Sequence, residues 1–339
     1  MIVDLRSDTV TRPTPAMRAA MDAAPLGDDV FHDDPSANAL QAKLAEMLGF
    51  EDALFMASGT QSNLCGLMSH CGRGDEYLVG QSAHTYRYEG GGAAVLGSIQ
   101  PQPITNQADG SIALADIESS IKPDDAHFAR TRLLALENTI GGKVLPLRYI
   151  ADATNLARRK GLGTHLDGAR LFNAAVAAGG DPYTAAREIA QHFESVSVCF
   201  SKGLGAPIGS MLCGSRELIE RARRWRKMLG GGMRQIGQLA AAASYALDHH
   251  VVRMADDHAL AKRLAAGLQG LPGITVDAPQ TNIVFVQVTP EKAQGLLDHL
   301  AANGVLATGL YTLRFVTHLD VDVAGIDRAI AAMSTYFRS

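Results

Sequence analysis

Two side chains with complementary chemistry, Asp167 and Lys202, each follow a short strand-like run and precede a glycine. Ligands of α/β sheets bind beyond the carboxyl ends of strands, so we expect both groups at neighbouring strand ends. A lysine amine can hold an aldehyde as a Schiff base, and an aspartate carboxylate can keep a pyridine nitrogen protonated. Asp167 and Lys202 together therefore predict a site for pyridoxal 5'-phosphate.

Each of these residues also has an ordinary structural explanation. Lys202 lies close to Gly203, Gly205 and Gly209, and a lysine beside glycines is commonly a solvated turn residue. Asp167 could be the N-cap of a following helix, which is a common role for aspartate. Their shared position after strand-like runs favours the chemical explanation over these alternatives.

Three further groups could complete such a site. Gly59 and Thr60 open a predicted helix, so their amides and the helix dipole could bind a phosphate, although taken alone a plain capped helix is the commoner role. His84 lies in a predicted loop, where an imidazole can stack on a ring or move a proton, and a structural histidine is the alternative. His127 could supply a second polar group at the substrate end.

Composition indicates an enzyme-sized globular protein. With 339 residues, 47% hydrophobic and 19% charged, the chain can bury a large core. A net charge of -4 provides no basic field for nucleic acid, and no apolar run approaches membrane-spanning length. The four cysteines lack metal-site spacing and no secretory leader is recognised, so we expect a cytoplasmic protein without a metal site that acts on a small molecule.

Strand-like and helix-like segments alternate along most of the chain, which predicts a mostly parallel sheet with helices on both faces. After about residue 240 the pattern changes to that of a smaller α+β layer. We expect an N-terminal arm (1–14), a large domain (15–245) and a small C-terminal domain (246–339). About seven strands are expected in the large domain, at 53–57, 76–79, 94–99, 132–136, 164–166, 196–200 and 210–213.

Several short motifs follow one another along nearly the whole chain and are far more specific together than apart. They are Asp4–Thr11, Asp33–Pro35, Ser58–Asn63, Gly80–His84, Leu136–Thr139, His165–Arg170, Ser201–Gly205, Gly230–Gln235 and Arg314–Asp320. In this order they resemble the bacterial low-specificity L-threonine aldolase family. That family has the fold type I of pyridoxal-phosphate enzymes, so the resemblance implies an α/β fold of this type.

The resemblance implies roles for the candidates named above. Lys202 would bind the aldehyde of the cofactor, Asp167 would pair with its ring nitrogen, and His84 would stack on its ring. Gly59 and Thr60 would bind its phosphate.

Four more residues take roles only through the resemblance. Ser7, Arg170 and Arg314 would receive the substrate carboxylate, and the planar guanidinium groups suit bidentate contact. Arg170 can also reach the cofactor cleft. Arg234 would reach the cofactor phosphate of a neighbouring subunit, because the family is typically tetrameric with active sites at subunit interfaces. We therefore expect a homotetramer.

The implied reaction is retro-aldol cleavage of L-threonine, L-allo-threonine and other β-hydroxy-α-amino acids to glycine and an aldehyde, acetaldehyde from threonine. A base must remove the β-hydroxyl proton, and we expect His84 in this role with His127 as its helper. The rival functions are a related β-eliminating lyase or aminotransferase, which would use the same lysine and aspartate, and a noncatalytic module that binds a phosphorylated ligand.

The chain departs from the family pattern at two aromatic positions. Relatives often show Tyr-Gly ahead of the Asp-Asp-Pro motif, where this chain has Phe31 and His32. Tyr88 occupies a position where an apolar aromatic is common. We expect Phe31 and Tyr88 to shape the pocket that receives the substrate.

Overall fold

The computed structural model describes residues 2–338, within which the strands form a seven-stranded, a three-stranded and a two-stranded sheet. The large sheet has the order β2-β8-β7-β6-β5-β3-β4. Strand β8 runs antiparallel to both of its neighbours, and the other pairs are parallel. The prediction of a mostly parallel seven-stranded sheet is therefore confirmed.

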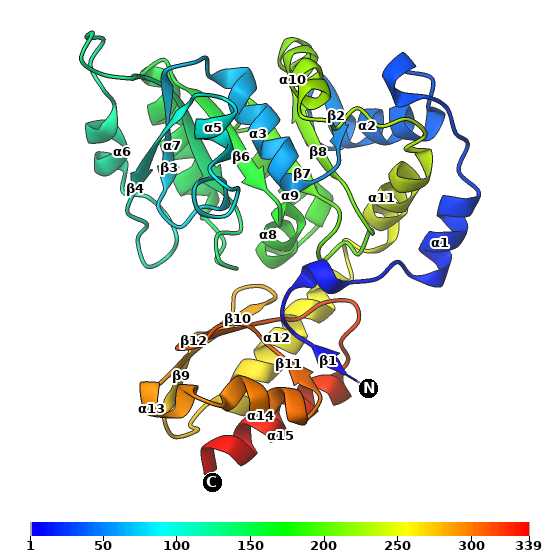
Figure 1. Cartoon of the computed structure of the whole chain (residues 1–339), viewed down its shortest axis with the longest axis vertical. Helices are drawn as coiled ribbons and strands as arrows, with labels where there is room; N and C mark the ends of the chain where they lie inside the picture. The colour runs from blue at the N-terminus through cyan, green and yellow to red at the C-terminus, as the bar shows by residue number, and fades with distance from the viewer. Residues whose placement is uncertain (1, 339) are drawn as a thin grey trace.

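Figure 1 shows the elements along the chain. The strands are β1 (Val3–Asp4), β2 (Asp52–Met56), β3 (Asp75–Gly80), β4 (Gln100–Ile104), β5 (Arg130–Glu137), β6 (Gly163–Gly168), β7 (Ser195–Cys199), β8 (Ser210–Gly214), β9 (Ile274–Val276), β10 (Ile283–Val288), β11 (Val305–Leu306) and β12 (Thr312–Val316). The helices are η1 (Asp8–Val10), α1 (Pro15–Asp22), η2 (Asp29–Phe31), α2 (Pro35–Leu48), α3 (Gly59–His70), α4 (His84–Arg87), α5 (Gly92–Val95), α6 (Leu114–Ser120), α7 (Leu147–Arg159), α8 (Leu171–Ala178), α9 (Pro182–Ala190), α10 (Arg216–Met228), α11 (Gly237–His249), α12 (Met254–Leu268), α13 (Pro290–Ala293), α14 (Leu296–Ala302) and α15 (Val323–Arg338).

One predicted strand is wrong. The apolar run 94–99 does not form a strand, since its beginning lies in α5, and the strand that follows is β4 at Gln100–Ile104. This strand contains Pro101 and Pro103 and lies at the edge of the sheet, where a proline's missing N–H costs no ladder hydrogen bond. Its prolines and glutamines hide the apolar pattern by which strands are recognised.

Alternating side chains of the large sheet enter different cores. Phe55 and Val198 pack into a core with α2, α7, α8, α9 and α11, whereas Leu54 and Leu212 pack on the other face against α3 and α10. This alternation follows from the two-residue period of a strand. Helices α3 and α10 thus cover the same face of the sheet and pack against each other, and α3 is the helix that starts with Gly59.

The C-terminal part has its own core below the large sheet in Figure 1. The antiparallel sheet β12-β10-β9 packs with α12, α14 and α15, and the core also contains Val3 and Leu5 from the N-terminal segment. Strand β1 pairs in parallel with β11, so the start of the chain is joined to its C-terminal part. The predicted boundary near residue 245 falls inside α11, and the division into domains stays a prediction. Among residues 2–338, no helix combines the length and the apolar character needed to cross a bilayer.

Candidate active site

The predicted acid and amine follow adjacent strands of the large sheet. Asp167 lies in β6, beside Glu137 of β5 and Ser197 of β7, and Lys202 follows β7 in the turn that leads to β8. The charge of Lys202 acts on Glu137, where it favours the ionised form of the carboxyl group. The amine is therefore close to the carboxyl ends of these strands, as the sequence predicts.

Asp167 is buried, and each of its carboxylate oxygens accepts a hydrogen bond from the protein. Its Oδ1 accepts a hydrogen bond from the backbone N–H of Ala169 at 3.0 Å, and its Oδ2 accepts one from Asn63 Nδ2 at 2.9 Å. The same Asn63 nitrogen donates to Glu89 Oε1 at 2.8 Å, and this oxygen also lies 2.8 Å from His84 Nδ1. Asn63 and Glu89 thus link Asp167 to His84 through hydrogen bonds.

The titrating groups of this cluster influence one another. The hydrogen bond that His84 donates to Glu89 is the main cause that raises the pKa of His84, and burial raises the pKa of Glu89. Glu137 accepts a hydrogen bond from the backbone N–H of His84 at 2.7 Å, and burial together with the charge of Asp167 raises its pKa to about 8. Glu137 therefore retains at neutral pH a proton that an isolated carboxyl group would lose.

The same groups account for the one grouping of possible metal ligands among residues 2–338. Atoms of His84, Glu89 and Asp167 that could bind a metal lie within 4.8 Å of one another. Direct hydrogen bonds and the bridging amide of Asn63 already hold them together.

Sequence reasoning missed Asn63, Glu89 and Glu137. Asn63 and Glu137 lie inside the quoted motifs, and Glu89 follows His84 by five residues.

Two predicted carboxylate-binding arginines have different partners. Arg170 makes two hydrogen bonds to buried Asp8, at 2.8 and 2.7 Å. Arg314 Nη2 donates to the carbonyl of Arg6 at 3.1 Å, and its buried Nε has no partner within the described chain. Burial and the charge of Arg170 lower the pKa of Arg314. An incoming carboxylate would reduce the repulsion between the two guanidinium groups.

A cavity of about 600 Å³ brings several of these residues to one space. His84, Tyr88, Glu137, Arg170 and Arg314 line it, with Arg314 reaching in from β12 of the C-terminal part. The rings of His84 and Tyr88 are 5.7 Å apart and tilted by 45°. Ser7 lies beside Asp8, where its hydroxyl caps η1 by accepting a hydrogen bond from Thr9 N–H.

The predicted phosphate-binding residues begin helix α3. Gly59 and Thr60 form its first turn, after the N-cap Ser58, whose hydroxyl accepts from Gln61 N–H at 3.2 Å. The glycine-rich loop 230–235 packs on this turn. A Cβ at Gly231 would lie only 2.3 Å from the side chain of Gln61.

The arginine of the same loop points elsewhere. Arg234 Nη1 lies 3.4 Å from Asp28 Oδ2, and more than half of its side chain is exposed. Its contact in this chain is therefore a carboxylate.

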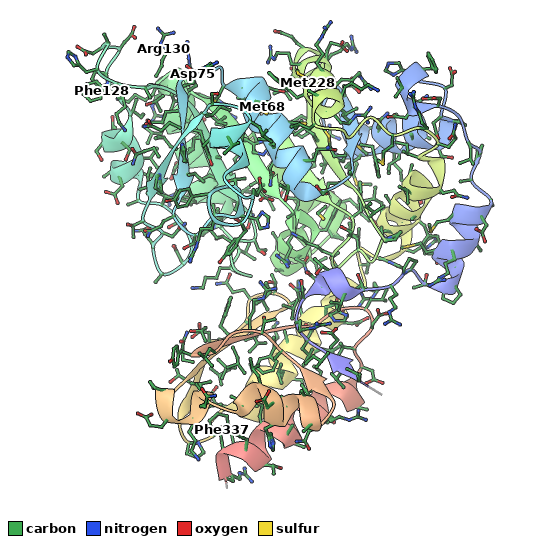
Figure 2. All side chains as sticks on the ribbon, in the orientation of Figure 1. Met68, Asp75, Phe128, Arg130, Met228 and Phe337 are labelled. Atoms are coloured by element: carbon green, nitrogen blue, oxygen red, sulfur yellow. The ribbon has the colours of Figure 1, made fainter. Side chains whose placement is uncertain are left out.

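The structure does not bring His127 or Phe31 to this cavity. His127 is 88% exposed and pairs with Asp125 at 2.6 Å, in the loop that precedes β5. That loop lies at the amino end of β5, whereas Glu137 and the cavity lie at its carboxyl end. In Figure 2 the labelled neighbour Phe128 is far from the C-terminal part that carries Arg314. Phe31 ends η2 and is 70% exposed.

Comparison with known proteins defines first the class and then the family. Residues 4–291 match the family model described as beta-eliminating lyase. A structure of SPT with PLP has a TM-score of 0.75 at 17% identity, covering 99% of this chain and 88% of that chain. The fold is that of the fold type I pyridoxal-phosphate enzymes.

Within this class, the chain belongs to the low-specificity L-threonine aldolase family. It is 54% identical over 320 residues to the low specificity L-threonine aldolase of Escherichia coli, covering 94% of this chain and 95% of that protein. The threonine aldolase of Leishmania major has the same fold, with a TM-score of 0.82 at 21% identity over 98% of both chains. The family resemblance inferred from the motifs is confirmed.

Proposed function

We propose that this chain cleaves L-threonine, L-allo-threonine and other β-hydroxy-α-amino acids to glycine and an aldehyde, with pyridoxal 5'-phosphate as its cofactor. The observation that carries the proposal is the position of Asp167 in β6 and of Lys202 just after the adjacent strand β7. Glu137, the neighbour of Asp167 on β5, lines a cavity that Arg314 also lines. Family membership supports the same reaction.

The residues present suit this cofactor. The buried carboxylate of Asp167 matches a protonated ring nitrogen, the amine of Lys202 can hold the aldehyde, and the first turn of α3 offers amides to a phosphate. When bound, the conjugated ring accepts the electron pair released at the substrate Cα. His84 would stack on the ring, and Arg170, which is close to Glu137, would border it.

Substrate binding is assigned to the cationic side of the cavity. Arg314, Arg170 and Ser7 would hold the substrate carboxylate, which fixes the direction of the Cα–Cβ bond. His84 would remove the β-hydroxyl proton through Nε2, because Nδ1 is engaged by Glu89. Tyr88 would contact the substrate side chain from beside His84.

The exposed candidates fit a role between subunits. We propose a homotetramer in which Arg234 reaches a neighbour's cofactor phosphate and Phe31 and His127 approach a neighbour's substrate. Their exposure in one chain leaves them available for such contacts.

A product assay tests the proposed function. The purified protein, loaded with pyridoxal phosphate, is incubated with each threonine diastereomer, and acetaldehyde and glycine are quantified. Equimolar acetaldehyde and glycine are expected, and Lys202→Ala should lose both this activity and the visible absorption band of the cofactor. Release of a keto acid and ammonia without glycine would instead establish β-elimination, which is the reaction named in the family description.

A further inference from the structure

A line of buried polar groups leads away from Asp167 beneath helix α3. Asn63 Nδ2 donates to Asp167, and Asn63 Oδ1 lies 3.2 Å from His165 Nε2. His165 Nδ1 lies 2.8 Å from Ser195 Oγ, which in turn lies 2.8 Å from His70 Nε2. The line joins both ends of α3 to strands β6 and β7, and nothing in the reaction described above uses it.

The donors of this line can be assigned in one direction. Both Asn63 Nδ2 hydrogens point to carboxylates, so Asn63 Oδ1 must accept from His165 Nε2–H. His165 Nδ1 then accepts from the Ser195 hydroxyl, whose oxygen accepts from His70 Nε2–H. Each group therefore donates toward Asp167.

The fold makes room for both imidazoles at two glycines. A Cβ at Gly66 of α3 would lie 2.8 Å from His165 Cε1, and a Cβ at Gly163 of β6 would lie 2.9 Å from His70 Nδ1. The two imidazole centres are 6.4 Å apart. Alanine at either glycine would displace a ring of the line, so the backbone is shaped around it.

Both rings are neutral at physiological pH. Burial lowers the pKa of His165 to about 3 and that of His70 to about 4. A neutral imidazole has one donor and one acceptor. His165 uses both in the assigned line, whereas His70 uses only its donor.

The line has a specific consequence for Asn63. A reversed side-chain amide would place Asn63 Oδ1 against the carboxylates of Asp167 and Glu89 and would withdraw a donor from each. Reversal would also place Nδ2 against the N–H of His165. Donation from His165 therefore fixes the amide in the orientation that favours an ionised Asp167.

We propose that His165, Ser195 and His70 are positioning residues that hold the Asn63 amide toward Asp167, and so keep this carboxylate ionised for the ring nitrogen of the cofactor. The inference rests on the proposed function, because that function supplies the group that Asp167 faces. If these residues only packed α3 against the sheet, substituting them would change the stability of the protein without changing the protonation of the cofactor ring nitrogen.

Spectroscopic titration of the cofactor-loaded protein separates these roles. His165→Leu removes the donor to Asn63, whereas His165→Gln retains an N–H near the Nε2 position. His258→Leu is the matched control, because His258 is also buried and contacts Asn173 outside the line. The affinity for pyridoxal phosphate and the pH midpoint of its visible band are measured for each variant, with the melting temperature of the cofactor-free protein.

For His165→Leu, we expect affinity to fall on the order of tenfold, the usual size of such supporting contacts. We also expect the band midpoint to rise, because a ring nitrogen that is less positive makes the conjugated lysine nitrogen easier to protonate. His165→Gln should restore the midpoint, and His258→Leu should leave it unchanged. A wild-type midpoint in His165→Leu, or the same midpoint change in His258→Leu, would overturn the proposal.

The two levels of proposal fail differently. If the wild-type protein develops no visible band with pyridoxal phosphate, the proposed function falls and this inference falls with it. If the wild type binds pyridoxal phosphate but the band midpoint of His165→Leu equals that of His258→Leu, the positioning role is rejected and the proposed function stands.

Should His165→Leu not fold, Ser195→Ala is compared with Ser69→Ala, a second buried hydroxyl that donates only to the carbonyl of Cys65. We expect a midpoint change in the same direction for Ser195→Ala but smaller, because His165 keeps its ring and loses only the bond that selects its tautomer. Equal midpoints in the two serine variants would reject the role.

Discussion

His84 and Glu89 form a pair whose proton sets the working pH of the proposed base. A base must be neutral to accept a proton, and the hydrogen bond that His84 donates to Glu89 raises the pKa of His84. The imidazole therefore becomes available only at higher pH than an isolated histidine would. Removing the charge of Glu89 should reverse this effect.

For Glu89→Gln, we expect the acidic limb of the pH profile of kcat/KM to move to lower pH. The glutamine preserves size and hydrogen bonding but no longer stabilises the imidazolium form, so the pKa of His84 falls. The measurement is cleavage of L-threonine across pH for the wild type and the variant. His84→Asn should lack the limb altogether, and a limb that stays in place in Glu89→Gln would remove His84 from the role of base.

Glu137 makes a separate contribution to the pH dependence of stability. Its pKa is raised from 4.5 to about 8, so between these values the folded chain holds a proton that the unfolded chain has lost. Stability then falls as pH rises through this window, by at most about 1.4 kcal/mol per pH unit. In cofactor-free protein, we expect Glu137→Gln to reduce the loss of unfolding free energy between pH 5 and pH 8. Urea unfolding at both pH values measures it, and equal losses in variant and wild type would contradict the assignment.

At the scale of elements, strands of the large sheet were predictable wherever apolar residues concentrate, as in β2 and β7. Strand β4 was not, because prolines and glutamines are tolerated at an edge. The two-residue strands β1 and β11 carry no periodic pattern at all, and their pairing depends on contacts between the two ends of the chain.

The same distinction holds for the candidate site. Asp167 and Lys202 could be found because each ends a strand-like run and the strands are neighbours. Asn63 and Glu89 could not, because their importance lies in contacts made across the fold, 104 residues apart in the case of Asn63 and Asp167. Exposure likewise depends on the tertiary fold, so the positions of His127 and Phe31 away from the cavity of their own chain could not be predicted from the sequence.

The N-terminal segment is tied to the large sheet by one buried ion pair. Arg170 holds Asp8 through two hydrogen bonds, with Asn282 Nδ2 as a further donor at 3.2 Å. Burial alone would raise the pKa of Asp8, but the charge and hydrogen bonds of Arg170 prevail and lower it to about 2. The pair therefore stabilises the fold at pH values above the ordinary pKa of an aspartate. This contribution is lost as the pH falls toward 2.

We expect Asp8→Asn to destabilise the protein by about 3–5 kcal/mol near neutral pH, because it leaves the guanidinium of Arg170 buried without its charge partner. Asp4→Asn is the matched control, since the Asp4–Arg6 pair has similar bidentate geometry in the same segment but is solvent-exposed. Exposed pairs contribute little to stability. Urea unfolding measures the loss of unfolding free energy in both variants. Equal losses would show that the buried Asp8–Arg170 pair stabilises the fold no more than the exposed Asp4–Arg6 pair.

At the scale of the whole molecule, one chain contains the amine, the acid and the arginines of the site but leaves other predicted contributors outside. The cavity lies where residues of the large sheet meet β10 and β12 of the C-terminal part, so its walls depend on how these two parts are packed. Arg234 contacts Asp28, although its loop packs on the first turn of α3. In the proposed tetramer, subunit contacts would decide whether Arg234 serves the site of its own chain or that of a neighbour.

Subunit mixing answers this question. Chains carrying Lys202→Ala lack the amine, and chains carrying Arg234→Ala lack the proposed phosphate contact, so each homotetramer should have little activity. If Arg234 acts across an interface, some sites in a mixed tetramer combine an intact Lys202 from one chain with an intact Arg234 from its neighbour. We therefore expect activity to reappear after the two variants are dissociated, mixed and reassembled, and a tetrameric mass by light scattering. If Arg234 served its own chain, every site in the mixture would still lack one of the two residues, and mixing would restore nothing.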